Sequence, residues 1–292
     1  MSADEDGFFE PFNSVAIVGV GLIGGSLGQA LKLRGLAREV VGVGRSPERL
    51  QRAVDLAAID RYSTDFSTGL TGADLIVLCT TIQNIIQSIP EALELRTSGA
   101  IVTDVGSTKS DIVAAAGGDP LFIGSHPMTG SEQAGVEAAT PGLFQNATWA
   151  VTPIDTTSSA ALVRVEALAR AIGSNLQTLT PQAHDAIVAI TSHLPHIMAS
   201  ALVRQAAIAR ETHSQTPAMS AGSFADATRV AASHPDIWRD VCLTNREAIL
   251  AVLRTYKNQL EEVESAIEDK DASRIEAFFK TGAEAKKNWK RG

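Results

Sequence analysis

The chain has 292 residues, more than the roughly 100 to 200 residues of a usual single domain, so its length predicts two domains. Its 45% hydrophobic residues, 20% charged residues and net charge of −8 are typical of a soluble globular protein. The negative charge leaves no wide basic surface for nucleic acid, so we predict no nucleic-acid partner.

The first ten residues, MSADEDGFFE, are acidic and have neither the positive segment nor the apolar segment of a secretory signal. We expect no run that reaches the 18 or more apolar residues of a membrane-spanning helix, and hence no membrane partner. The two cysteines, Cys79 and Cys242, lie in apolar runs where buried free thiols are expected. We therefore expect a cytoplasmic protein, and we predict no metal site.

A strand, a glycine-rich loop and a helix follow one another near the N-terminus. Residues 14–19 (SVAIVG) form a short buried strand, and residues 19–28 (GVGLIGGSLG) lead into a helical pattern that ends near Gly35. In this order the first glycine makes the tight turn, the second lets the backbone approach a pyrophosphate, and the third lets helix pack on strand. We predict that the loop binds NAD or NADP through Gly19, Gly21, Leu22, Ile23 and Gly24. A glycine turn without a nucleotide is the alternative.

The tip of the second strand, Glu39–Val43, bears on the choice of cofactor. An NAD enzyme usually has a carboxylate there to hold the ribose 2′-hydroxyl, but this chain has Gly44, Arg45 and Ser46. Arg45 can pair with a 2′-phosphate and Ser46 can donate to it, so NADP is favoured and NAD remains possible. Arg45 as a solvated turn residue, or stacked on adenine, is also open.

Strands and helices alternate through the rest of the first half. The further strands are expected at Ala73–Thr80, Ala100–Val105, Leu121–Gly124, Thr148–Thr152 and Leu176–Leu179, with helices from Gln83 and over Ser158–Ile172. This alternation predicts an α/β fold with a doubly wound, Rossmann-type parallel sheet. Ligands lie beyond the carboxyl ends of such strands, which places Thr80, Thr81 and residues 106–109 near cofactor or substrate.

From about Pro181 onward the pattern is helical. Residues 182–211 are interrupted at the SHLPH segment, a polar loop covers Thr212–Gly222, and a last helix is expected over Ser273–Trp289. A heptad-like apolar series would run along one helix from Asp236 to Glu268: Ile249, Leu253, Tyr256, Leu260, Val263 and Ile267. We therefore predict a dinucleotide-binding domain over 12–180 and an all-α domain over 181–292 that forms a homodimer. An intramolecular helix pair is the alternative.

Four separated segments carry a family resemblance: VTDVGSTK (102–109), GSHPMTGSE (124–132), HDAIVAITSHLPH (184–196) and FADATRVAASHPDIWRD (224–240). In this order they resemble the prephenate and arogenate dehydrogenases of tyrosine biosynthesis. Members of that family oxidise the ring C4 hydroxyl of a small-molecule substrate with NAD(P), and the ring carboxylate leaves as CO2. The resemblance implies the same reaction here and a helical dimerisation domain. It leaves open whether prephenate, arogenate or both are substrates.

The resemblance implies a catalytic pair at the carboxyl edge of the sheet. His126 matches the histidine that accepts a hydrogen bond from the C4 hydroxyl, and an imidazole is a suitable proton acceptor for alcohol oxidation. Ser107 matches a serine that hydrogen-bonds the same hydroxyl, although a serine there could also be a helix N-cap. Lys109 is a candidate for a structural ion pair.

The resemblance also implies the residues that bind the substrate. Arg229 matches the arginine that holds a substrate carboxylate, and His196 matches a histidine near substrate and nicotinamide. Glu132 matches an acidic residue at the mouth of the site, and Trp238 is expected in the pocket wall. Each residue also has an ordinary alternative: Arg229 could be a solvated charge, Glu132 a glutamate in a first helical turn, and Trp238 a core tryptophan. His193 is expected to be structural.

Two other functions remain open at this stage. One is a different two-domain enzyme, such as a β-hydroxyacid dehydrogenase or a pyrroline-5-carboxylate reductase, which would use other catalytic residues. The other is a nucleotide sensor without turnover, against which the joint presence of Ser107, His126, His196 and Arg229 argues.

Overall fold

The computed structural model describes residues 9–130 and 133–289. The chain divides into two compact units, residues 1–245 and residues 246–292, and each is described by itself. The first unit therefore contains the sheet together with the helices from Pro181 up to Asn245. This division lies well after residue 180, where the sequence predicts the domain boundary, because helices beyond Pro181 pack against the sheet and its helices.

A single eight-stranded sheet forms the framework of the first unit. Its strands are β1 (Phe12–Val18), β2 (Ala37–Val43), β3 (Arg61–Ser63), β4 (Leu75–Leu78), β5 (Ile101–Asp104), β6 (Phe122–Met128), β7 (Thr148–Thr152) and β8 (Asn175–Thr178). Their spatial order is β3-β2-β1-β4-β5-β6-β7-β8, with every neighbouring pair parallel except β6 and β7. The first six strands follow the order of a dinucleotide-binding fold, which confirms the predicted Rossmann-type sheet. The antiparallel pair is the one departure from it.

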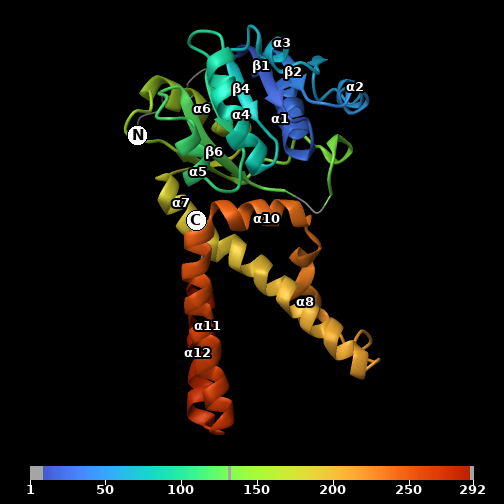
Figure 1. Ribbon diagram of the computed structural model, residues 1–292, viewed down its shortest axis with the longest axis vertical. Helices are drawn as coiled ribbons and strands as arrows, with labels where there is room; N and C mark the ends of the chain where they lie inside the picture. Colours follow the sequence, from blue (N-terminus) through green and yellow to red (C-terminus); the bar gives the residue numbers. More distant parts are fainter. Residues whose placement is uncertain (1–8, 131–132, 290–292) are drawn as a thin grey trace, which may run out of the picture. The chain divides into compact units, whose positions relative to one another are not determined.

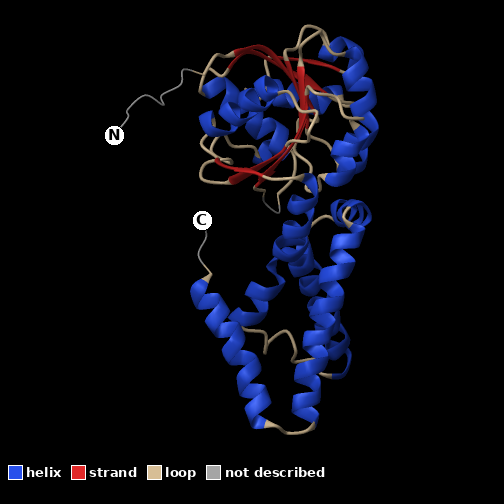
Figure 2. Cartoon of the chain, turned by 90° about the vertical axis from the view of Figure 1, so that its left-hand side faces the viewer, coloured by secondary structure: helices blue, strands red, loops and turns tan. Residues whose placement is uncertain are grey.

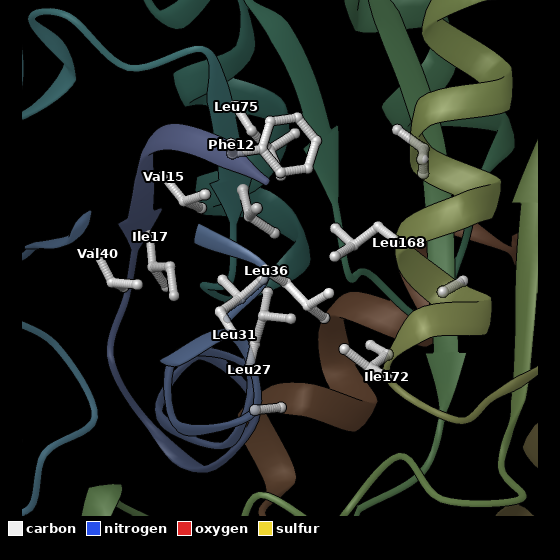
Figure 3. Packing of buried hydrophobic residues seen from close by; sticks show 14 of the residues in the cluster. Phe12, Val15, Ile17, Leu27, Leu31, Leu36, Val40, Leu75, Leu168 and Ile172 are labelled. Carbon is white, nitrogen blue, oxygen red and sulfur yellow. The ribbon is translucent and has the colours of Figure 1, made fainter. Parts of the chain in front are cut away.

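The central strands are apolar on both faces because helices cover both sides of the sheet (Figure 2). On one face Val15 and Ile17 of β1 pack with Leu27 and Leu31 of the first helix, and Leu168 of a later helix joins the same cluster (Figure 3). The alternate residues of β1 and β4 are buried as well. This double burial explains why these strands are continuous β-branched and leucine runs in the sequence.

The helices of the first unit alternate with the strands and then follow one another (Figure 1). They are α1 (Leu22–Leu33), α2 (Pro47–Asp55), α3 (Phe66–Leu70), α4 (Ile82–Leu95), α5 (Ser110–Ala115), α6 (Ser159–Ala171), α7 (Pro181–Val188), α8 (Leu194–Thr212), α9 (Gly222–Thr228) and α10 (Pro235–Thr244). The predicted helix starts near Gln83 and at Ser158 are confirmed to within a residue. The short elements β3 and α3 were not predicted, because three to five residues carry too little periodicity.

The strand β6 is longer than the sequence predicts, and this changes the setting of His126. The apolar run predicts a strand that ends at Gly124, with His126 in the loop beyond it. In the structure β6 continues to Met128, because β7 pairs with it antiparallel and His126 lies opposite Ala150. His126 therefore projects from a hydrogen-bonded strand, which restricts its backbone more than a loop would.

The helical run Pro181–Thr212 is interrupted once, by a π-helical turn over Ala189–His193 between α7 and α8. An 18-residue window within this 32-residue run has a mean hydropathy of 1.6, so the run is long and apolar enough to cross a membrane by length and composition. The run is interrupted by Thr191, Ser192, His193 and His196, so it contains no 18 consecutive apolar residues. Core helices of soluble proteins pass the same test, so one such helix is weak evidence for a membrane.

The long helix predicted from Asp236 to Glu268 is two helices. It ends as α10 at Thr244, and Asn245 has the non-helical backbone angles φ −117° and ψ 33°. The Asn245 side chain donates to the backbone oxygen of Asp185, 2.8 Å away, which holds the break in place. The apolar heptad-like series begins only at Ile249 and so gave no sign of the break at Asn245.

The second unit consists of α11 (Arg246–Glu268) and α12 (Ala272–Asn288). The two helices contact each other across a short turn, where Asp271 caps α12 by accepting hydrogen bonds from the backbone of Ser273 and Arg274. An intramolecular helix pair is thus present. Leu260 and Ile267 of the heptad-like series are 46% and 59% exposed in the single chain, which leaves apolar surface for a partner.

Candidate active site

The loop after β1 is shaped by two glycines that no other residue could replace without a shift. Gly19 has φ +94°, and a Cβ there would lie 2.7 Å from the Thr80 side chain and 2.8 Å from the Cys79 backbone oxygen. A Cβ at Gly24 would lie 2.2 Å from the Gly19 backbone oxygen. The tight turn and the close approach of α1 to the loop therefore depend on these positions.

The start of α1 has the properties of an anion site. Gly21 is the N-cap and supplies no side-chain cap, so the backbone N–H groups of the first turn, which includes Leu22 and Ile23, lack that partner. A Cβ at Gly21 would meet no protein atom within 4 Å, so the backbone there is open to a ligand. Thr80 lies beside this loop, and its buried hydroxyl oxygen has no hydrogen-bond partner within the described chain. These features fit the pyrophosphate of a dinucleotide.

Thr81 has a different place from Thr80. It is exposed and is the N-cap of α4, at the carboxyl end of the neighbouring strand β4, and its side chain makes no capping hydrogen bond. It therefore faces the same edge of the sheet that a nucleotide would occupy.

At the tip of β2, Arg45 and Ser46 are in different situations. Arg45 is exposed, whereas Ser46 caps α2 by accepting a hydrogen bond from the Arg49 backbone at 3.3 Å. The Ser46 hydroxyl donates to Glu48 Oε2 at 2.8 Å, and hydrogen bonding to Ser46 lowers the pKa of Glu48. Ser46 would have to release Glu48 to donate to a 2′-phosphate. Arg45 is thus the better placed of the two predicted contacts.

A buried ion pair fixes the loop after β5. The Lys109 ammonium pairs with Asp104 and donates to the Ser125 backbone oxygen at 2.7 Å, and both charged side chains are fully buried. Asp104 also accepts hydrogen bonds from the backbone of Gly106 and Ser125. Burial lowers the pKa of Lys109, and the attraction of Asp104 opposes this effect. The pair joins β5 to β6, and Lys109 has the structural role expected of it.

Ser107 lies within the loop that this ion pair holds. It is partly buried, and α5 begins at Ser110 with Lys109 as its N-cap. The alternative role of Ser107 as a helix N-cap is therefore wrong. Its position at the carboxyl end of β5 is the one that a ligand-contacting residue would occupy.

His126 is hydrogen-bonded to a second histidine. Its Nδ1 lies 2.9 Å from His184 Nε2 on α7, and the two rings meet edge to face with centroids 5.1 Å apart. Burial holds the pKa of His126 well below 6.5, and the nearby His184, Lys109 and His193 lower it further. His126 is therefore neutral at neutral pH and can accept a proton.

His184 is in turn bound to Asp185, the next residue on α7. His184 Nδ1 lies 2.9 Å from Asp185 Oδ1, and the carboxylate accepts the backbone N–H groups of Lys109 at 2.7 Å and Ser110 at 2.8 Å. Burial alone would raise the pKa of Asp185, but the hydrogen bonds from His184, Ser110 and Lys109 outweigh it and hold that pKa below its ordinary value. Asp185 is therefore an anion that connects α7 to the start of α5.

Sequence reasoning assigned no role to His184 or Asp185. Both stand at the start of the HDAIVAITSHLPH segment, so the segment pointed to them. The contact that places them at the site is the hydrogen bond between His184 and His126. These residues are 58 positions apart, so no local pattern shows it.

His196, Trp238 and Arg229 gather at a second point of the first unit. The ring of His196 is stacked on Trp238, with centroids 3.7 Å apart and planes 26° from parallel. Burial lowers the pKa of His196, the hydrogen bond of its Nδ1 to the Ser192 oxygen opposes this, and the charge of exposed Arg229 lowers it further. Trp238 is partly exposed, so it lies at a surface wall and not in the core.

His193 connects these two groups of residues. It is buried, its Nδ1 lies 3.1 Å from Asn245 Nδ2, and its ring meets Trp238 edge to face at 6.0 Å. Burial lowers its pKa to about 4. Since Asn245 also binds the Asp185 backbone, His193 has the structural setting that the sequence predicts for it.

Glu132 lies outside the described residues. Among the residues that the structure does describe, no group of three or more histidine, cysteine, aspartate or glutamate side chains could hold a metal ion.

Two family models match the chain in tandem. The model described as "Prephenate dehydrogenase, nucleotide-binding domain" matches residues 27–178, and the model described as "Prephenate dehydrogenase, dimerization domain" matches residues 180–281. The glycine loop at 19–24 lies before the first match, so its interpretation rests on its own geometry.

Individual relatives agree with the family models. The chain is 32% identical over 279 residues to a prephenate dehydrogenase of Bacillus subtilis, a match that covers 92% of this chain and 74% of the relative. It is 33% identical over 281 residues to a cyclohexadienyl dehydrogenase of Zymomonas mobilis, covering 94% and 95%. A solved prephenate dehydrogenase of Aquifex aeolicus, in complex with hydroxyphenyl propionate and NAD+, has a TM-score of 0.83 at 27% identity, covering 94% and 97%.

The glycine loop leads to a prediction that separates ligand binding from folding. Gly21→Ala should fold like the parent chain, because its Cβ enters open space. The Cβ should meet the pyrophosphate and raise the dinucleotide Kd roughly 10-fold or more, a loss of about 1.4 kcal/mol of binding free energy. Gly24→Ala should instead lower the thermal midpoint, since its Cβ would strike the Gly19 oxygen. Titration calorimetry and thermal denaturation measure the two effects. An unchanged Kd in Gly21→Ala would remove this loop from the nucleotide site.

Proposed function

The chain belongs to the prephenate dehydrogenase family, and from this premise we propose that it oxidises prephenate, arogenate or both with NAD(P)+ and releases CO2, in tyrosine biosynthesis. The observation that carries the proposal is a neutral histidine, His126, which is hydrogen-bonded to His184. It lies on the same edge of the sheet as the glycine loop, whose following helix has no side-chain N-cap. Family membership removes the β-hydroxyacid dehydrogenase and pyrroline-5-carboxylate reductase alternatives. A nucleotide sensor without turnover is left to experiment.

His126 serves as the proton acceptor in this proposal. The C4 hydroxyl proton of the substrate moves to His126 while a hydride leaves C4, and bound NAD(P)+ supplies the acceptor for that hydride. The bond to the ring carboxylate breaks, CO2 departs, and the bonding electrons make the ring aromatic. Low pKa matters here because a protonated His126 could not accept the hydroxyl proton.

The substrate contacts are proposed from the placement of the remaining residues. Arg229 would hold a substrate carboxylate, a task suited to a planar guanidinium, while His196 on Trp238 would form one wall of the pocket. Ser107 would hydrogen-bond the C4 hydroxyl from the loop after β5. Glu132 is proposed to lie at the mouth of the site, and only the family resemblance supports this role.

We further propose NADP as the preferred cofactor, with NAD as the alternative. Exposed Arg45 at the tip of β2 supports this, and Gly44 beside it supplies no carboxylate for a ribose 2′-hydroxyl. Glu48, which is hydrogen-bonded to Ser46, disfavours NADP because its negative charge would repel a 2′-phosphate.

The proposed organisation is a nucleotide-binding domain over 12–180 and a helical domain over 181–292 through which two copies form a homodimer. The match to a dimerization-domain family model and the exposed apolar side chains of α11 support it. We propose a cytoplasmic enzyme with a small-molecule substrate and with no nucleic-acid or membrane partner.

Turnover tests the proposal directly. Purified protein supplied with prephenate or arogenate, each with NAD+ or NADP+, should reduce the cofactor, followed by its absorbance, in at least one of the four combinations. Absence of turnover in all four, with dinucleotide binding intact by calorimetry, would favour the sensor.

The His126→Asn variant tests the proton acceptor. It should lower kcat by roughly 10²- to 10⁴-fold, the usual contribution of a general base, with the dinucleotide Kd little changed. In the parent enzyme kcat/KM should fall on the acidic side only well below pH 6.5, because the active form is the unprotonated histidine. His234→Asn is the matched control, since His234 is exposed and asparagine can also cap α10. Parent-like turnover of His126→Asn would contradict the role.

The Arg45→Ala variant tests the cofactor preference. Loss of one charge-assisted contact of about 1.5–3 kcal/mol should raise KM for NADP+ by roughly 10- to 100-fold and leave KM for NAD+ nearly unchanged. Arg38→Ala, at the opposite end of β2, removes a similar exposed charge and should change neither value. Equal effects of Arg45→Ala on both cofactors would speak against a 2′-phosphate contact.

A further inference from the structure

Three residues form a hydrogen-bonded line that ends at the proposed proton acceptor. Asp185 Oδ1 lies 2.9 Å from His184 Nδ1, and His184 Nε2 lies 2.9 Å from His126 Nδ1. His184 is 1% exposed and Asp185 is 4% exposed. The bond between His184 and Asp185 is therefore shielded from water, where hydrogen bonds are strong and direction matters, and the bond to His126 is partly buried.

The direction of each bond follows from the carboxylate. Asp185 is an anion that accepts two backbone N–H groups from the start of α5, and an ionised carboxylate can only accept hydrogen bonds. His184 Nδ1 must therefore carry the proton that points at it. If this is the only ring proton of His184, its Nε2 is bare and can only accept.

The same reasoning extends to His126. Because His184 Nε2 accepts, His126 Nδ1 must donate, so its proton is on Nδ1. The neutral ring then has its lone pair on Nε2, the nitrogen that His184 does not occupy. This is the tautomer that can take a proton from a substrate hydroxyl.

We propose that His184 and Asp185 are positioning residues for the dehydrogenase reaction, which set the tautomer of His126 and hold its ring with Nε2 bare. The proposal rests on the proposed function, because it gives His126 the part of proton acceptor. When His126 takes the hydroxyl proton, its Nδ1–H stays bonded to His184, and the new positive charge faces Asp185 through one imidazole.

Other charged groups face His126 as well. The Lys109 ammonium is close enough to lower its pKa and would oppose a cation on His126, whereas His193, with its pKa lowered to about 4, is uncharged at neutral pH. Asp185 is the anion linked to His126 by hydrogen bonds, so it offsets this repulsion when the proton arrives.

The tautomer can be measured without any turnover. In protein labelled with ¹⁵N-histidine, the nitrogens of His126 are assigned by comparison with His126→Asn, and the shift of each nitrogen reports whether it carries a proton. At neutral pH the proton should be on Nδ1, with Nε2 bare. A proton on Nε2 would overturn the proposal, whether or not the protein turns over prephenate or arogenate.

Two variants of His184 separate positioning from packing. His184→Leu removes the acceptor and should lower kcat roughly 10²-fold, near the lower end of general-base effects, with KM for the dinucleotide unchanged. His184→Gln retains an amide oxygen that can accept from His126 Nδ1, so it should keep the Nδ1–H tautomer and recover part of kcat.

The outcomes are distinguishable from failure of the proposed function. If the parent enzyme shows no turnover, the proposed function fails while the ¹⁵N measurement still decides the tautomer. If turnover exists but His184→Leu and His184→Gln lose equal activity, or if both retain parent kcat, the positioning role is overturned. Thermal denaturation of each variant identifies a loss that comes from unfolding.

Discussion

Asp185 is a buried carboxylate whose two oxygens accept hydrogen bonds from the backbone of Lys109 and Ser110 and from the ring of His184. Its own backbone oxygen accepts the Asn245 side chain. One residue on α7 therefore links the start of α5, the end of α10 and the histidine that touches His126. A buried anion is stable only when hydrogen bonds replace its lost water, so its partners are held to narrow positions. The geometry of the candidate site depends on this requirement.

A second buried charge gives the sheet edge its rigidity. Lys109 and Asp104 are fully buried, and each would cost several kcal/mol to bring out of water if it were alone. Together with Ser125 they join β5 to β6 just before His126. Replacement of one partner would leave an uncompensated charge, which commonly costs about 3–5 kcal/mol. The loop that carries Ser107 thus lies between two polar anchors, Asp104 and Asp185.

These anchors give His126 its chemical character. The strand β6 fixes its backbone, burial and the nearby Lys109 ammonium keep it neutral, and His184 occupies one ring nitrogen. A neutral histidine with one nitrogen bound and the other available is what a hydride-transfer enzyme needs at the substrate hydroxyl. The glycine loop at α1, by comparison, specifies a dinucleotide but would fit many reactions.

The sequence by itself determined the class of fold, the glycine loop and the family, since each of these is written in local patterns. Continuous apolar strands, helix starts such as the one near Gln83 and contiguous motifs such as GSHPMTGSE depend on residues that are neighbours in the chain. Tertiary structure alone decided that β6 continues through His126, that Asn245 breaks a long amphipathic helix, and that His184 and Asp185 reach the site. Each of these depends on a partner far away in sequence: β7 for the strand, Asp185 for Asn245, and His126 for His184. Periodicity reports which face of an element is buried, but it contains no information about which distant residue will lie against it.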